Sequence, residues 1–553
     1  MNKPHKKNSK AIKRLEDNAG RGNLFSAFQL YKNYVTGQYV GEPNEEKADY
    51  YLAKLSKYLK DTVLKIDSIS LREFKRFRHL EVDFHPNLTV IVGDNGAGKT
   101  SIVEAVTTCL SYINNNLLRK NVGGKKIKGS AVNKKATDYS ELACHFSLNK
   151  ANHMELALFS PVSGYSGNST THIETVKQFG EIHRLLNQAD DITIPFLASY
   201  PVDRSSAKMP TIALEKGFYR NASSRFNAIK DTLSLGVISD GFVNTFIELT
   251  NLAEGEDTQE IRQVKQAIKV LDELIEQRSE QGSEEIRDAL LKERDSARQK
   301  LTALVPEKSA KYRDLLSDVN TVINTFIPEL LSIGVDRSTG SDRLLFKFKN
   351  VEVEFNQLSD GQKALISLVG DLTLRLVSLN PHLANPREAQ GIVVIDEIDL
   401  HLHPKWQQIV PNALSRAFPN LQFILTTHSP QALSTLDNKC IRKIYFDKHG
   451  EAKLTTPEQQ TKGVVSSDIL ERIMETFSVP PINEARWLSD YWAKIIENTW
   501  ESNEGKQLFA KIIAHFGDEH PETMKLRSEI RLQQLKNKVH AKKSQAQANK
   551  DKG

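Results

Sequence analysis

The sequence predicts an α/β fold with a helical hairpin insertion, a small helical N-terminus and a helical C-terminus. Three observations carry this prediction. An apolar strand runs into a glycine-rich loop and a helix near residues 88–110, and a β-branched strand ends in two carboxylates near 391–397. Between them, residues 255–317 are densely charged with apolar positions at helical spacing. At 553 residues, the chain is too long for one core.

The composition is that of a soluble globular protein, with 39% hydrophobic and 26% charged residues. No apolar run is long enough to cross a bilayer, and the basic N-terminus lacks the apolar segment of a secretory signal. The three cysteines, Cys109, Cys144 and Cys440, form no CxxC pair. This spacing argues against a zinc ribbon or a disulfide framework, and we expect a cytoplasmic location without membrane contact.

Positive charge is concentrated in three segments, although the net charge is only +6. Residues 119–135 hold seven Lys or Arg and no acid, and residues 525–553 hold nine against two acids. The first fourteen residues carry six more. Each segment alone fits a solvated terminus or a floppy loop equally well, but together they favour contact with nucleic-acid phosphates.

Six segments are expected along the chain. Residues 1–60 carry small residues at the spacing of a Sel1/TPR-like helical unit, and strand patterns begin a first α/β lobe at 61–235. A helical hairpin of about thirty residues per arm occupies 236–330. The second lobe spans 331–455, a helical partner-binding region spans 456–524 with Trp487, Trp492 and Trp500 as packing anchors, and a basic, polar tail follows at 525–553.

The stretch "GDNGAGKT" is the most specific motif in the chain. It follows the apolar strand "LTVIV" and precedes the helix "SIVEAVTTCL", which is the context that a phosphate-binding P-loop requires. Glycines let backbone N–H groups wrap phosphates at a helix N-terminus, and Lys99 is expected to reach the β- and γ-phosphates of ATP. The predicted phosphate-binding set is Gly93, Asn95, Gly96, Gly98, Lys99, Thr100 and Ser101.

The stretch "GIVVIDEIDLHLHP" supplies the expected metal and base residues. Its buried strand ends at the edge where α/β sheets bind ligands. We expect Asp396 to hold Mg²⁺ together with the Thr100 hydroxyl, and Glu397 to polarise the attacking water. A zinc site built from Asp399, His401 and His403 is the alternative, but the helix that follows offers no further ligand.

The order of the motifs narrows the class. Lys99 and Asp396 lie 297 positions apart (396 minus 99). The segment "LSDGQ" at 358–362 precedes the strand that ends in Asp396 and Glu397. The strand "FILTT" then ends at His428. These residues resemble the ABC-type heads of the RecF, structural-maintenance and overcoming-lysogenization ATPases over roughly residues 63–450.

The resemblance implies two heads that sandwich two nucleotides. Ser359, Gly361 and Gln362 would then contact the nucleotide of the other head, His428 would sense the γ-phosphate, and Asp399 would lie near the dimer seam. The glutamine that follows a strand in these heads is not found, since "FLASYPVDR" offers Tyr200, Asp203 and Arg204 instead. Arg72, Phe74 and Lys75 occupy a turn that contacts nucleotide in related heads.

The whole arrangement resembles the PtuA ATPases of Septu antiphage systems, in their retron-associated form. This resemblance implies an ATPase, slow in turnover, that regulates a PtuB-like HNH nuclease within a homodimer or larger oligomer. It also implies a complex with a retron reverse transcriptase and its single-stranded DNA or RNA. No acidic nuclease site is found after His428. The alternatives are a RecF-like DNA-repair clamp without a nuclease and a nucleotide-fixed scaffold with negligible turnover.

Overall fold

A six-stranded sheet forms the centre of the larger of two units in this computed structural model. The structure describes residues 3–162, 164–165, 171–187, 192–202, 225–233, 239–253, 259–277, 284–337, 342–383, 385–475 and 482–550. The strand order of this sheet is β13-β12-β3-β11-β10-β6, and all neighbouring pairs are parallel except β12 and β13. The strands are β3 (Leu88–Val92), β6 (Phe196–Tyr200), β10 (Gly391–Ile395), β11 (Leu421–Thr426), β12 (Ile441–Phe446) and β13 (Ala452–Thr455).

Every residue of β3, β6, β10 and β11 is buried, which explains why their sequences are continuous apolar runs rather than alternating patterns. Parallel neighbours place the carboxyl ends of β3, β11 and β10 along one edge of the sheet. The P-loop, the carboxylate pair and the histidine strand, which lie far apart in the sequence, therefore meet at that edge.

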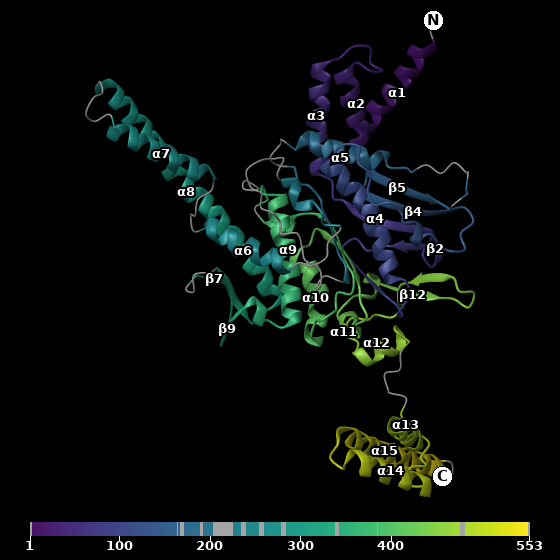
Figure 1. The fold of residues 1–553 in the computed structure, drawn as a ribbon. Helices are drawn as coiled ribbons and strands as arrows, with labels where there is room; N and C mark the ends of the chain where they lie inside the picture. The colour runs from purple at the N-terminus through teal and green to yellow at the C-terminus, as the bar shows by residue number, and fades with distance from the viewer. Residues whose placement is uncertain are drawn as a thin grey trace. The chain divides into compact units, whose positions relative to one another are not determined.

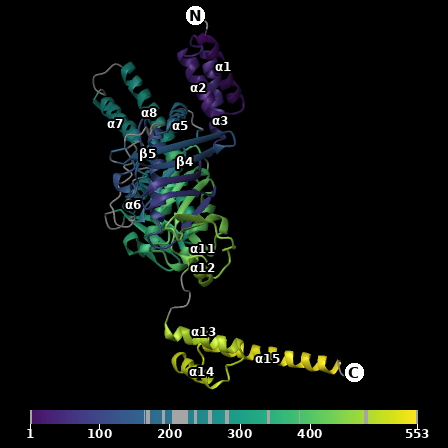
Figure 2. The same cartoon turned by 90° about the vertical axis from the view of Figure 1, so that its right-hand side faces the viewer.

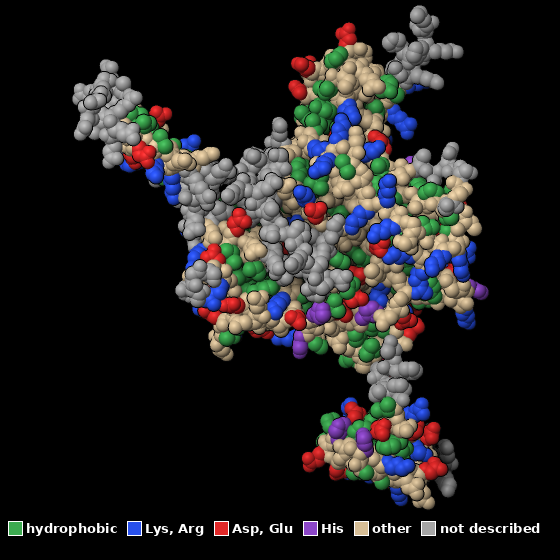
Figure 3. All heavy atoms as spheres, viewed as in Figure 1, with side chains coloured by type: hydrophobic (Ala, Val, Ile, Leu, Met, Phe, Trp, Pro, Cys, Tyr) green, Lys and Arg blue, Asp and Glu red, His purple; other side chains and the backbone are tan. Residues whose placement is uncertain are grey.

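A second, antiparallel sheet packs on the same core, with strand order β2-β1-β4-β5. Its strands are β1 (Lys65–Phe74), β2 (Phe77–Asp83), β4 (Tyr139–Asn149) and β5 (Asn152–Pro161). The P-loop helix α4 (Lys99–Leu118) contacts strands of both sheets. Buried Gln422 on β11 joins the sheets, since its side chain accepts a hydrogen bond from the Ile66 N–H at 2.8 Å and donates one to the Ile66 carbonyl at 2.9 Å. Blue Lys and Arg side chains are scattered over the face around this sheet (Figure 3).

The helical insertion is a hairpin with unequal arms (Figure 1). Helix α7 (Gln259–Gln277) has 19 residues and α8 (Glu284–Phe326) has 43, where arms of equal length were expected. Arg294 and Arg298 of α8 pair with Asp272 of α7 at 3.7 and 3.3 Å. Helix α6 (Ser239–Ala253) packs on α8, and the sheet β7 (Leu330–Asp336), β8 (Arg343–Phe348) and β9 (Glu352–Glu354) follows.

The N-terminal segment, where a Sel1/TPR-like helical unit was expected, forms three helices: α1 (Lys3–Gly20), α2 (Leu24–Thr36) and α3 (Glu45–Lys60), side by side in Figure 2. These helices contact the antiparallel sheet: the side chain of Asn152, at the start of β5, accepts a hydrogen bond from the Leu24 N–H at 2.7 Å. Lys32 also pairs with Glu181 of α5 (Glu174–Leu186) at 3.5 Å. The remaining helices of the larger unit are α9 (Asp360–Leu379), α10 (Pro404–Ala417) and α11 (Pro430–Leu433).

The smaller unit spans residues 467–553, and α12 (Ser466–Arg472) begins it. Its helices α13 (Asn483–Ile496), α14 (Asn503–Phe516) and α15 (Pro521–Lys550) enclose a core of Tyr491, Ile495, Trp500, Ile512 and Leu526. Of the expected tryptophan anchors, Trp500 is buried, Trp487 packs at the core edge and Trp492 is exposed. The expected boundary at residue 525 falls inside α15, which runs on as one long helix (Figure 2).

Candidate nucleotide-binding site

The P-loop joins β3 to α4 through backbone conformations that require glycine. Gly96 and Gly98 have φ angles of 76° and 103°, in the left-handed region that only glycine adopts without strain. A side chain at Gly98 would also place its Cβ 2.3 Å from the Phe77 ring. Asn95 is exposed in the loop and Ser101 lies in the first turn of α4, so the predicted phosphate-binding set is contiguous around one helix N-terminus.

Lys99 is folded onto the loop that precedes it. Its ammonium donates hydrogen bonds to the carbonyls of Gly93 at 2.8 Å and Asp94 at 3.1 Å. Burial lowers the pKa of Lys99, and the nearby carboxylates of Glu397 and Asp396 oppose that shift. A cation held in a partly desolvated loop next to these carboxylates is suited to bind anionic phosphate.

Thr426 at the end of β11 positions both carboxylate residues. Its hydroxyl donates to Asp396 Oδ1 at 2.5 Å and accepts from the Glu397 N–H at 2.7 Å. Asp396 is only 1% exposed, and its own N–H donates to the Tyr200 carbonyl at 2.9 Å. Glu397 has a φ angle of 48°, a strained conformation for a non-glycine residue and one often found at functional sites.

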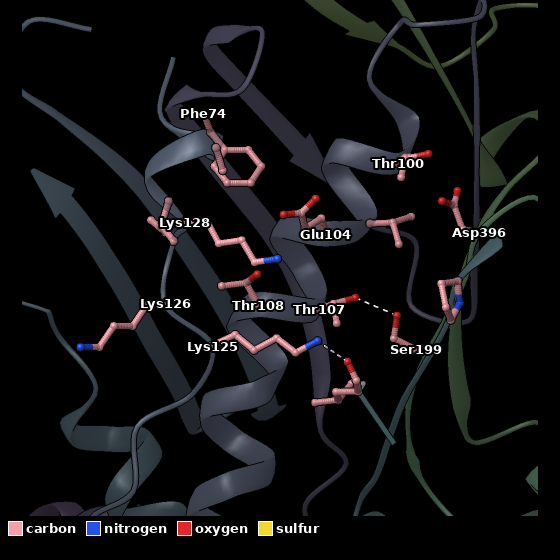
Figure 4. Close-up of a pocket in the computed structure, with 15 residues that line it drawn as sticks. Phe74, Thr100, Glu104, Thr107, Thr108, Lys125, Lys126, Lys128, Ser199 and Asp396 are labelled. Carbon is pink, nitrogen blue, oxygen red and sulfur yellow. Dashed lines mark hydrogen bonds between the residues drawn. The ribbon is translucent and has the colours of Figure 1, made fainter. Parts of the chain in front are cut away.

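A cavity of about 660 Å³ opens beside this edge (Figure 4). Thr100 from α4 and Asp396, the residue after β10, both line it. A hydroxyl and a carboxylate are the hard oxygen ligands that Mg²⁺ prefers, so the residues present fit the predicted metal. The other residues that line the cavity are Phe74, Val103, Glu104, Thr107, Thr108, Lys125, Lys126, Ile127, Lys128, Ala131, Ser199, Pro201 and Leu233.

The "LSDGQ" segment begins helix α9 with reciprocal side-chain caps. The Ser359 hydroxyl accepts from the Gln362 N–H, and Gln362 Oε1 accepts from the Ser359 N–H at 3.0 Å. At Gly361 a Cβ would lie 2.5 Å from the carbonyl of His401, so glycine is needed where this helix meets the loop after Glu397. Ser359 is exposed at the surface.

The acids and histidines after Glu397 serve the loop and the next helix. Asp399 Oδ1 accepts from the Thr427 hydroxyl at 2.6 Å and from the His428 N–H at 3.3 Å. His403 Nδ1 instead accepts from the Lys405 N–H as the cap of α10. Within the ranges that the structure describes, no cluster of three or more His, Cys, Asp or Glu side chains could hold a metal ion.

The turn between β1 and β2 contributes a residue that the sequence analysis missed. Arg72 pairs with Asp138, Lys75 pairs with Glu104, and Phe74 is buried. Arg76, the next residue, stacks 3.8 Å from the ring centre of Phe446.

The Arg76 guanidinium would lie 3.7 Å from a Cβ on Gly96, beside the P-loop. Only the pairing of β12 with β3 brings these groups together, so no local pattern could have identified Arg76. Tyr200, the last residue of β6, is buried, whereas Asp203 and Arg204 lie outside the described residues.

Comparison with known proteins identifies the family of this chain. A family profile described as "AAA ATPase domain" matches residues 64–433. The "Retron Ec83 probable ATPase" of Escherichia coli is 28% identical over 94% of this chain and 96% of its own length. The "Retron Vc95 probable ATPase" of Vibrio cholerae serotype O1 biovar El Tor is 30% identical over 85% of this chain and 90% of its own. "Septu protein PtuA" of Bacillus mycoides is 31% identical over 28% of this chain and 21% of its own.

Proposed function

Because the chain belongs to the AAA ATPase domain family, together with retron-associated ATPases, we propose that it is the ATP-hydrolysing regulator of an antiviral defence complex. One observation carries the hydrolytic part of the proposal: the P-loop, the Asp396–Glu397 pair and the His428 strand share one edge of one sheet. Residues more than three hundred positions apart thereby surround one phosphate-binding loop.

Each residue at this edge has a distinct task. Lys99 and the N–H groups at the start of α4 would bind the phosphates, and Thr100 and Asp396 would hold Mg²⁺. The metal supplies charge neutralisation for the phosphates when it is bound. Glu397, with its backbone fixed by Thr426, orients water and accepts its proton, while His428 senses the terminal phosphate.

A second copy of the chain completes the site in this proposal. The P-loop residues Asn95 and Gly96 are exposed, and so is Ser359 at the start of α9. Exposure of both surfaces is what a head-to-head dimer needs, because Ser359 and Gly361 of one copy would contact the nucleotide of the other. The homodimer, or a larger oligomer built from it, would form with ATP and open after hydrolysis.

The effector in this proposal is a separate HNH nuclease of the PtuB kind. Relatives named for retrons and for Septu support a complex that also holds a reverse transcriptase and its single-stranded DNA. The C-terminal unit, whose α13–α15 bundle has its own core, is the candidate docking module for the nuclease. Among the described residues no helix is both long and apolar enough to cross a membrane.

Two variants of the purified protein test the proposal. Glu397→Gln keeps the shape of the side chain but removes the base, so ATP-bound dimers should accumulate on size-exclusion chromatography while phosphate release stops. Lys99→Ala should abolish both ATP binding and the dimer. Exposed Lys150, in the turn between β4 and β5, provides a matched control as Lys150→Ala. Unchanged phosphate release by Glu397→Gln would mean that the base lies elsewhere.

The alternatives give different results in the same experiments. A repair clamp would show strong stimulation of hydrolysis by gapped DNA and would co-purify with no nuclease. A nucleotide-fixed scaffold would form the ATP dimer in the wild type and in Glu397→Gln alike, with negligible phosphate release from either. Co-purification of an HNH protein with a reverse transcriptase and a small single-stranded DNA would support the retron complex.

A further inference from the structure

Residues 119–135, named here the lysine loop, are held in place by the P-loop helix itself. Asn115 and Asn116 of α4 donate side-chain hydrogen bonds to the carbonyls of Gly123 at 2.8 Å and Val122 at 2.9 Å. The Ser111 hydroxyl accepts from the Lys125 N–H at 2.7 Å. Asn116 and Ser111 are buried, so these polar side chains in the C-terminal half of α4 form hydrogen bonds with the loop backbone and fix its path.

The far end of the lysine loop is fixed to the turn between β1 and β2. The Lys75 N–H donates to the Ala131 carbonyl at 2.6 Å, and the Asn133 N–H donates to the Glu73 carbonyl at 2.9 Å. Near its start, a Cβ at Gly124 would lie 2.3 Å from the Tyr112 ring. The alternative prediction of a floppy loop is therefore wrong, because hydrogen bonds at both ends hold the backbone of these basic residues in place.

This backbone aims two lysines into the 660 Å³ cavity beside the metal-binding edge. Figure 4 shows Lys125 and Lys128 extending toward the α4 side chains Glu104 and Thr108, whereas Lys126 points away. Lys125 also donates to the Leu233 carbonyl, and burial together with the neighbouring Lys128 lowers its pKa. Glu104, the carboxylate beside these lysines, is already paired with Lys75, so the two cations leave an excess of positive charge in this part of the cavity that favours a bound anion.

Positive charge continues outside the cavity along the same loop. The exposed residues Arg119, Lys120, Lys134 and Lys135 have no acidic residue among them in the sequence, although Lys120 lies 3.8 Å from Glu181. A single small anion would need only the two inner lysines. Further cations on both sides of the two inner lysines in the same loop instead match a chain of phosphates.

We propose that the cavity seats one backbone phosphate of a single-stranded nucleic acid between Lys125 and Lys128, and that the outer residues of the lysine loop follow the neighbouring phosphates. No aromatic side chain lies in the loop, so this contact reads charge rather than sequence. Because Thr100 and Asp396 line the same cavity, the strand would end next to the ATP site. Binding itself does not depend on the proposed ATPase function; only its effect on turnover does.

The test is fluorescence anisotropy of a labelled single-stranded oligonucleotide at several salt concentrations, with the full-length chain. Each phosphate contact on a single strand contributes about 0.7 to the slope of log affinity against log salt. The Lys125→Gln/Lys128→Gln double variant loses the one phosphate that both lysines hold, so it should lower the slope by about 0.7. The control, Lys150→Gln/Lys448→Gln, removes the same charge from the β4–β5 and β12–β13 turns and should leave the slope unchanged.

Three outcomes would overturn the inference. Equal slopes for the test and control variants would mean that the cavity holds no strand phosphate. Competition by free AMP as strong as that by the oligonucleotide would assign the cavity to a mononucleotide. Loss of fluorescent ATP-analogue binding in parallel with loss of oligonucleotide binding would assign the lysines to the ATP phosphates. Lys99→Ala separates the two proposals, because it should lose the ATP analogue and keep the oligonucleotide.

Discussion

The Asp399 carboxylate accepts a hydrogen bond from the Thr427 hydroxyl at 2.6 Å, which joins the loop after β10 to the residue before His428. The His428 N–H donates to the same oxygen at 3.3 Å. The loop that carries the proposed catalytic base and the loop that carries the proposed phosphate sensor are therefore one connected structure. Gly361 at the start of α9 lies against this loop as well, through the carbonyl of His401.

Loss of the Asp399–Thr427 contact should impair hydrolysis more than binding. A hydrogen bond to a charged group contributes about 1.5–3 kcal/mol, so Thr427→Val should lower kcat roughly tenfold or more if the contact is required for His428 alignment. ATP affinity should change little, because Lys99 and the P-loop are untouched. Thr427→Ser keeps the hydroxyl and is the matched control. A fall in ATP affinity equal to that in kcat would contradict this assignment.

Breaking a buried ion pair on α9 should strongly destabilise the fold. Asp371 accepts from Arg375 Nε at 2.9 Å and from the Tyr200 hydroxyl at 2.9 Å, and all three residues are nearly inaccessible to solvent. Arg375→Met leaves a buried carboxylate without its cation and should cost about 3–5 kcal/mol in urea unfolding. Tyr200→Phe removes one hydrogen bond and should cost less.

The double variant Asp371→Leu/Arg375→Met separates charge from packing in this pair. It removes both charges, so it should recover most of the stability that Arg375→Met loses. A double variant as unstable as the single one would mean that the two side chains act through their shape. Circular dichroism during urea unfolding provides the measurement.

Buried His183 on α5 should make the fold sensitive to mild acid. Burial lowers the pKa of His183 from its ordinary value of 6.5 to about 4, with Arg225 and Arg184 adding to the shift. Between these two values the unfolded chain binds more protons than the folded one, so stability falls as pH falls from 6.5 to 4. The full loss attributable to this group is roughly 3 kcal/mol.

His183→Gln removes this proton uptake and offers an amide N–H to the Phe179 carbonyl, which the ring nitrogen contacts at 2.9 Å in the wild type. Urea unfolding of both proteins between neutral pH and pH near 4 is the measurement. The stability difference between wild type and variant should shift in favour of the variant as pH falls. A difference that stays constant with pH would show that His183 does not titrate in this range.

Two truncations within α15 should show which part of this helix is needed for the core of the C-terminal bundle. Leu526 is 3% exposed and belongs to the bundle core, with Ile530 packed against it. Ending the chain after Met524 removes both residues and should expose α13 and α14 to limited proteolysis. Ending it after Val539, which is exposed, should leave the bundle protected. Charge in this helix is better tested by Lys536→Gln/Lys538→Gln, which leaves the core intact.

Motifs that are contiguous in the sequence could be predicted residue by residue. The P-loop from Gly93 to Ser101 and the cap of Ser359 by Gln362 depend on neighbouring residues alone. The hydrogen bond from the Thr426 hydroxyl to Asp396 could not be predicted, because it depends on β11 lying beside β10. Arg76 and the two inner lysines were missed as site residues for the same reason, since their positions are fixed by strands and helices distant in sequence.

The sequence by itself determined the class of this protein: an α/β head whose glycine-rich loop, paired carboxylates and strand-end histidine specify nucleotide chemistry. These motifs depend on steric and hydrogen-bonding requirements among residues that are adjacent in the sequence, so the sequence alone is enough to identify them. Only the tertiary structure decided which groups meet at the sheet edge and that the basic segment at 119–135 is a shaped loop. Strand order and helix packing bring together residues that no local pattern links, and burial then fixes their geometry and charge.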